Sequence, residues 1–155
     1  VLAVPSGLAL AELSDPVRGL PPEQARILHN CIQFNFGTPH TQRVARWYQS
    51  VLPGHRLIAQ CRSYEMALSL VRAGKGVCLV PALAVKDDEA GVDLYEAGLP
   101  PRSIVAVLPS QYQRVEPYRT FLSCLTAAGK VVAMPAMHPA PPFIRGRETG
   151  VLKQA

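Results

Sequence analysis

The pattern of hydrophobic and polar positions along the chain predicts strands that alternate with amphipathic helices. Short, mostly apolar runs predict buried strands at residues 1–4, 31–36, 57–61, 77–80, 92–95 and 103–108. Between them, apolar residues recur at helical spacing, which predicts helices at residues 22–28, 38–52, 64–73 and 117–128. Helices that connect buried strands are typical of a mostly parallel sheet with crossover helices. We therefore expect the α/β fold class.

The ends of these helices carry specific signals. Thr38-Pro39 predicts a helix start, because threonine is a favoured N-cap and proline is tolerated in the first turn. Ser63 is placed to cap the next helix. Gly74 permits the left-handed turn that ends a helix, and Gly76 lets the chain turn tightly into the following strand. In the same way, Gly129 is expected to end the last helix.

Length and composition fit a globular chain of one domain or one and a half. The chain has 155 residues, of which 48% are hydrophobic and 17% are charged. No apolar run reaches the roughly 18 residues that a membrane span requires, and no secretory leader is visible. From residue 131 onward the chain is rich in proline, which predicts a mostly unfolded, flexible tail over residues 131–155. The missing initiator methionine suggests an excised fragment.

Charge and titratable residues exclude several classes of chemistry. The formal net charge is +5, but the lysines and arginines are scattered. This favours a solvated basic surface with a modest attraction for small anions over a nucleic-acid interface. The four cysteines have no CxxC spacing, and the four histidines have no metal-ligand spacing. We therefore expect structural thiols in a reducing cytoplasm, with no metal and no cofactor.

One segment carries a recognisable signature. Residues 70–81 read LVRAGKGVCLVP: a helix ending in Val-x-Ala-Gly, then x-Gly, a short apolar strand and proline. This resembles the effector-binding domain of LysR-type transcriptional regulators. Further similarities follow in the family's order, at Val1–Pro5, Phe34–Gly37 and Pro117–Leu122. Where the family usually has His-Pro-Leu-Ala after its first strand, this chain has Leu8-Ala9-Leu10-Ala11. The resemblance covers roughly residues 1–128.

The resemblance implies a fold like that of periplasmic binding proteins, with two subdomains around a cleft. Residues 1–91 would form the second subdomain. Residues 92–130 would supply a crossover strand, a strand and the C-terminal helix belonging to the first subdomain. The chain would then be truncated at its N-terminus, and DNA would be contacted only through an absent helix-turn-helix. The predicted strand 103–108 would lack neighbours, and an unpaired strand edge favours self-association or swapping with another chain.

The candidate binding site lies where the predicted parallel strands end. Ligands of open α/β sheets bind outside the carboxyl ends of the strands, and helix N-termini there favour anions. We expect a small effector in the inter-subdomain cleft; family resemblance and the helix ends favour a carboxylate. Its predicted contacts are Phe36, Gly37, Thr38, His40, Thr41, Ser63, Val80 and Pro81. The alternative is structural: Thr38 and Ser63 only cap helices, His40 faces water, and Val80 and Pro81 pack in the core.

Two other functions compete with a ligand-sensing regulatory domain. A solute-binding protein of the related two-lobed transport type has the same expected fold, but a secretory leader would favour it. An enzyme with a cysteine nucleophile at Cys78 is the other alternative. Cys78 is flanked by apolar residues in GVCLV and has no evident base to activate it. We therefore expect no catalytic residues.

Overall fold

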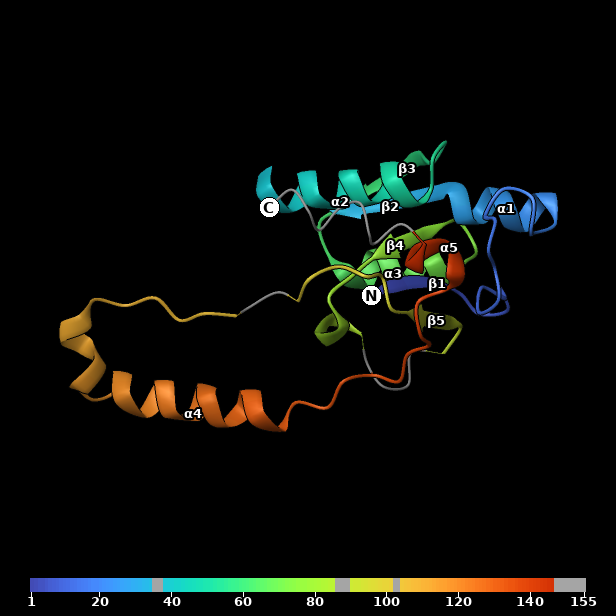
Figure 1. The fold of residues 1–155 in the computed structure, drawn as a ribbon. Coiled ribbons are helices and arrows are strands. Elements are labelled where there is room, and N and C mark those ends of the chain that lie inside the picture. The colour runs from blue at the N-terminus through green and yellow to red at the C-terminus, as the bar shows by residue number, and fades with distance from the viewer. Residues whose placement is uncertain (35–37, 86–89, 102–103, 147–155) are drawn as a thin grey trace. The chain divides into compact units, whose positions relative to one another are not determined.

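A computed structural model describes residues 1–34, 38–85, 90–101 and 104–146. The chain divides into two compact units (Figure 1). Unit 1 is formed by Val1–Leu99 together with Pro135–Ala155, and unit 2 by Pro100–Met134. These units are divided differently from the subdomains expected from sequence, whose boundary was placed at residue 91. The assignment of residues 92–130 to a first subdomain stays a prediction.

Unit 1 is built on a five-stranded sheet. The strands are β1 (Leu2–Pro5), β2 (Asn30–Phe34), β3 (Arg56–Cys61), β4 (Val77–Leu79) and β5 (Val92–Tyr95), in the spatial order β3-β2-β4-β1-β5. β2 pairs in parallel with both β3 and β4, whereas β1 is antiparallel to β4 and to β5. The mostly parallel sheet predicted from sequence is thus correct for β3-β2-β4 and wrong for both pairings of β1. A buried apolar run can pair in either direction, so hydrophobicity alone does not fix the direction of β1.

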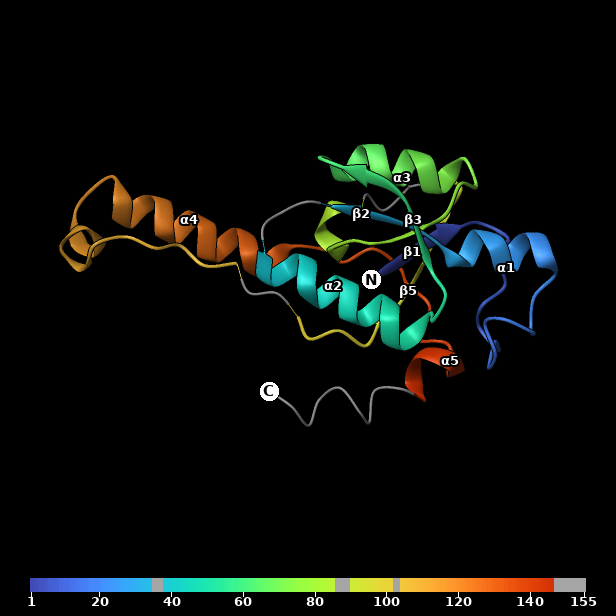
Figure 2. The ribbon, with the colours of Figure 1, turned by 90° about the horizontal axis from the view of Figure 1, so that it is seen from above.

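Helices cover both faces of this sheet. Successive side chains of a strand point to opposite faces, so β1 sends Leu2 and Val4 to one face and Ala3 to the other. The first face packs against α1 (Pro22–His29), α2 (Thr38–Val51) and α5 (Pro142–Arg145). The second face packs against α3 (Tyr64–Arg72). Figure 2 shows α3 on one side of the sheet and α2 with α5 on the other.

The helix α3 and the turn after it confirm the local signals in the sequence. The Oγ of Ser63 accepts a hydrogen bond from the amide of Met66 at 3.2 Å, so Ser63 is the N-cap. Gly74 has φ +68°, and two backbone bonds close the helix end: Gly74 to Val71 and Lys75 to Leu70. Gly76 then passes so close to β2 that an added Cβ would lie 2.4 Å from the carbonyl oxygen of Asn30.

The proline-rich segment after unit 2 is not unfolded throughout. Pro135, Ala140 and Pro141 are buried, as are Phe143 and Ile144 of α5. The prediction of a mostly unfolded tail is therefore wrong for residues 135–145. Composition indicated disorder because proline is abundant, but proline is compatible with an ordered extended segment that buries its neighbours.

Unit 2 contains the short helix η2 (Ser110–Arg114) and α4 (Tyr118–Val131). Residues 104–108 form no strand, contrary to the sequence prediction, and Ile104, Val105 and Val107 are exposed. A strand requires a hydrogen-bonded neighbour, and none of the described segments pairs with these residues. The prediction that Gly129 ends the helix is also wrong, because α4 continues to Val131 and Gly129 has no positive φ.

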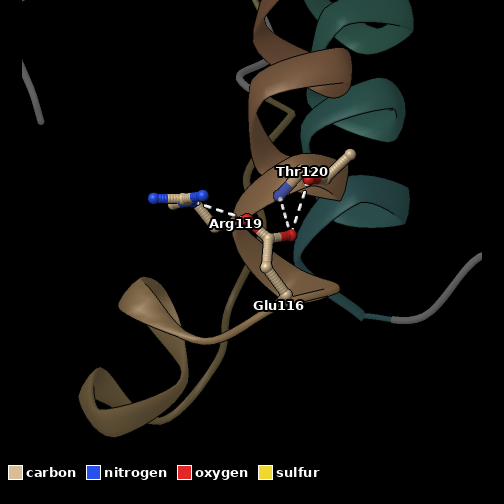
Figure 3. Close-up of polar contacts among 3 residues, drawn as sticks. All are labelled: Glu116, Arg119 and Thr120. Carbon is tan, nitrogen blue, oxygen red and sulfur yellow. Dashed lines mark hydrogen bonds and ion pairs between the residues drawn. The ribbon is translucent and has the colours of Figure 1, made fainter.

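The start of α4 is held by a carboxylate instead of a capping hydroxyl. Glu116 accepts hydrogen bonds from the amide (3.3 Å) and hydroxyl (2.6 Å) of Thr120 (Figure 3). Its other oxygen accepts from Nε of Arg119 at 2.6 Å. The hydrogen bond from the Thr120 hydroxyl lowers the pKa of the Glu116 carboxyl most, followed by the bond from Arg119. The negative charge also suits the positive end of the helix dipole, so α4 begins at a defined position.

Candidate functional site

The candidate site is the carboxyl edge of three adjacent parallel strands, β3, β2 and β4. Because these strands run in the same direction, their carboxyl ends meet at one edge of the sheet. Ser63 follows the end of β3, and Val80 with Pro81 follows the end of β4. Both sets flank the end of β2, which leads toward α2. The topology therefore brings the predicted segments to one edge, although they are far apart in the sequence.

Five of the eight predicted contacts lie between the end of β2 and the first turn of α2. α2 begins at Thr38, as the Thr38-Pro39 signal predicts. Phe36 and Gly37 lie outside the described residues, and so do the side chains of Thr38 and His40. Thr41 lies in the first turn of α2 and is partly buried. The role of these five residues in effector binding stays a prediction.

Ser63 occupies the N-terminus of α3 at this edge. Its side chain is exposed, and its oxygen accepts the helix-capping bond described above. The capping role that the sequence allowed is thereby confirmed. A hydroxyl that accepts one hydrogen bond can still donate its proton, so capping does not prevent Ser63 from contacting a carboxylate. Arg62, next to it, is also exposed.

Tyr64 is a further candidate that the sequence analysis did not consider. It is the first residue of α3, and its ring packs against Phe34 at the end of β2, with ring centroids 4.4 Å apart and an interplanar angle of 56°. The aromatic pair thus joins the carboxyl ends of β2 and β3. The only sequence signal was its position directly after a helix cap, which is too common to single out a binding residue.

Val80 and Pro81 differ in their surroundings. Val80 is buried in the core cluster on the α3 face, and its amide donates to the carbonyl oxygen of Val1 at 3.0 Å. Core packing, the structural alternative for Val80, is therefore confirmed. Pro81 is half-buried and precedes the short helix η1 (Ala82–Ala84). Of the two, Pro81 is the residue with side-chain surface left for a ligand.

The buried thiols of the sheet are poor nucleophiles. Burial raises the pKa of Cys78 to about 12, and the nearby Cys61 adds to the effect. Burial likewise raises the pKa of Cys31 to about 11. A thiol must ionise to attack a substrate, so Cys78 stays protonated and inert near neutral pH. This argues against the cysteine-nucleophile alternative.

Among residues 1–34, 38–85, 90–101 and 104–146, no group of three or more histidine, cysteine or acidic side chains is arranged to hold a metal ion. Within the same residues, each helix is too short or too polar to cross a membrane.

Comparison with known families gives one match. The family model described as the LysR substrate binding domain matches residues 1–130. No curated protein and no solved structure matched the chain. The matched segment contains the whole sheet, helices α1 to α3 and the candidate edge, and it stops before the proline-rich segment that packs on unit 1.

Proposed function

The chain belongs to the family of LysR substrate-binding domains, and on this basis we propose that it senses a small anionic effector for a DNA-binding transcription regulator. Domains of this family are regulatory, and their role is to sense ligands. The carboxyl edge of β3-β2-β4 would form one wall of the effector cleft. DNA contacts would belong to a helix-turn-helix separate from these residues, and the regulator would act in the cytoplasm.

One observation carries the choice of this edge. Two helices, α2 and α3, begin at the carboxyl ends of the adjacent strands β2 and β3. Each helix N-terminus presents amide N–H groups and the positive end of its dipole, which together favour a negatively charged ligand. Ser63 caps the second of these ends, and the exposed Arg62 directly precedes it in the chain. A carboxylate is the simplest small ligand that satisfies this set of donors.

Binding would regulate by shifting a conformational equilibrium. A ligand stabilises the arrangement that binds it more tightly, by an amount set by its difference in affinity between two arrangements. In a regulator, that shift changes how the DNA-binding parts of an oligomer are presented. The same contacts at the sheet edge would therefore serve both recognition and signalling.

A pair of substitutions at Ser63 tests the site. Asparagine and aspartate cap helices about as well as serine, so Ser63→Asn and Ser63→Asp should unfold at nearly the wild-type temperature. They differ from each other by one negative charge. We expect Ser63→Asp to weaken carboxylate binding at least about tenfold and Ser63→Asn to change it much less. Thermal shift against aromatic and aliphatic carboxylates, followed by calorimetry on the strongest, measures this.

Ser69 provides the matched control. It lies on the same helix, and its hydroxyl donates to the carbonyl oxygen of Glu65 within α3. Ser69→Asp adds the same charge away from the sheet edge and should leave carboxylate affinity within about twofold of wild type. Equal weakening by Ser63→Asp and Ser69→Asp would show that general charge, not this edge, controls binding.

Self-association is the second part of the proposal, and it rests on unit 2. Residues 104–108 read IVAVL, and Val107 is 92% exposed. An exposed apolar segment with unpaired backbone groups is a template for pairing with another chain. We expect Val107→Asp to reduce the sedimentation coefficient to that of a monomer at all concentrations. Val17→Asp, at an exposed valine of unit 1, should leave association unchanged. A monomeric wild-type chain would contradict this part of the proposal.

A further inference from the structure

Residues 135–145, here called the strap, are the part of unit 1 that follows unit 2 in the chain, and they pack on the sheet. The strap contributes Ala140, Phe143 and Ile144 to the core cluster on the α1–α2 face of the sheet. Its Met137 packs against the cluster on the opposite, α3 face. The strap therefore passes around the edge of the sheet at β5 and contacts both layers. It also lies beyond residue 130, where the family match stops.

The strap is attached to β5 at a single point. The amide of His138 donates to the carbonyl oxygen of Leu94 at 2.7 Å, and the amide of Glu96 donates to the carbonyl oxygen of His138 at 2.9 Å. Between these bonds, the rings of Tyr95 and His138 stack with centroids 4.9 Å apart. Further along, the amide of Phe143 donates to the carbonyl oxygen of Leu13 at 3.1 Å. The contacts of His138 thus cover the outer edge of β5 at Leu94–Glu96, and the bond from Phe143 anchors the strap further along.

The strap pairs with β5 only locally. Prolines stand at positions 135, 139, 141 and 142. Among the described residues, the pairing of the strap with β5 is an isolated parallel bridge between Tyr95 and His138 and does not continue as a ladder. β5 is held independently of the strap, because it pairs with β1 over four residue pairs. The strand pairing of β5 therefore does not depend on the strap.

The strap also determines how unit 2 is connected. The chain leaves unit 1 after Leu99 and returns to it at Pro135. The outgoing connection is fixed near Ala97, whose carbonyl oxygen accepts a hydrogen bond from Nε1 of Trp47 at 2.6 Å. The returning connection is fixed by the strap alone among the described residues. With the strap docked, unit 2 is tethered at both ends; with it released, unit 2 is tethered only through Leu99.

From these observations we propose that the strap docks reversibly on the β5 edge. It detaches from that edge as one unit while the sheet stays folded. Its detachment frees one of the two connections to unit 2 and uncovers the β5 edge. This is a conformational device of this chain that is separate from effector binding. Its test uses no effector, so its outcome is independent of the function proposed above.

Amide hydrogen exchange on the full chain tests the proposal. Phe143→Ala removes a buried ring of the strap, whereas Arg145→Ala changes an exposed neighbour in the same helix and serves as the control. In Phe143→Ala, we expect the amides of Glu96, His138 and position 143 to exchange together, at least about a hundredfold faster than in wild type. The amides of β2, β3 and α3 should keep their wild-type rates, and Arg145→Ala should change none of these rates.

Two outcomes would overturn the proposal. If the amides of β2 and β3 lose protection by the same factor as Glu96 and His138, the strap unfolds together with the sheet and does not detach independently. If Glu96 and His138 keep wild-type protection, the strap does not depend on its buried ring for docking. Ile144→Val, a milder truncation of a buried side chain, gives the same two readings with a rate change of about three- to tenfold, should Phe143→Ala fail to fold.

Discussion

Two apolar runs of similar sequence differ in secondary structure and in burial. Residues 76–80 read GVCLV and contain β4, which is fully buried between β2 and β1. Residues 104–108 read IVAVL, remain exposed and form no strand. Hydrophobicity predicted a strand in both cases. The difference shows that an apolar run becomes a strand only where neighbouring strands satisfy its backbone hydrogen bonds and other layers cover its side chains.

The same contrast holds between two amphipathic helices. In α3, Ala67, Leu68 and Val71 are buried against the sheet. In α4, no residue is buried, and Phe121 is 62% exposed. Both helices have an apolar face at helical spacing, but only α3 lies on a sheet that uses it. Helices gain most of their stability from such packing, so we expect α4 to open more readily than α3.

Matched leucine truncations give the largest expected difference between the two helices. Leu68 is 2% exposed, and Leu125 is 39% exposed. We expect Leu68→Ala to lower the free energy of unfolding of unit 1 by about 3 kcal/mol, because it removes buried methyl groups and leaves a cavity. Leu125→Ala should change it by less than about 0.5 kcal/mol. The single tryptophan, Trp47, is buried in unit 1, so its fluorescence during urea unfolding measures both values.

A strong effect of Leu125→Ala would contradict the expected difference between α3 and α4. If Leu125→Ala destabilises unit 1 as strongly as Leu68→Ala does, the apolar face of α4 is covered in solution. Sedimentation at the same protein concentrations would then distinguish cover by a second chain, which depends on concentration, from cover within the chain, which does not.

The next largest difference in stability is expected between Gly76→Ala and Gly129→Ala, and the two substitutions should have effects of opposite sign. At Gly76 an added Cβ would meet the backbone of Asn30, which cannot move without disturbing β2. We expect Gly76→Ala to destabilise unit 1 by about 2 kcal/mol. At Gly129, inside α4, an added Cβ meets nothing within 4 Å. Gly129→Ala should therefore stabilise α4 by about 0.5–1 kcal/mol, because alanine favours the helix.

Two measurements check the glycine pair. Urea unfolding followed by Trp47 fluorescence reports Gly76→Ala, and amide protection within α4 reports Gly129→Ala. A neutral effect at Gly76 would mean that the close approach between the β4 turn and β2 relaxes at little cost. A loss of α4 protection at Gly129 would mean that this position needs a conformation other than helix.

The sequence by itself determined the features that depend on a few neighbouring residues. The start of α2 at Thr38, the cap of α3 at Ser63 and the turn at Gly74 were all predicted where they occur. Caps and positive-φ turns are set by local hydrogen bonds and local sterics, so short segments encode them. The signature at residues 70–81 belongs to the same class, and the family match confirms the membership that it indicated.

The tertiary structure decided the features that depend on distant partners. The direction of β1, the exposure of residues 104–108 and the docking of residues 135–145 were each predicted incorrectly or not at all. It also decided which predicted site residues share one edge, and it added Tyr64 through its contact with Phe34. Strand pairing and burial join residues far apart in the chain. A pattern of apolar positions therefore limits the structures that a segment can adopt, and its tertiary contacts determine which one it adopts.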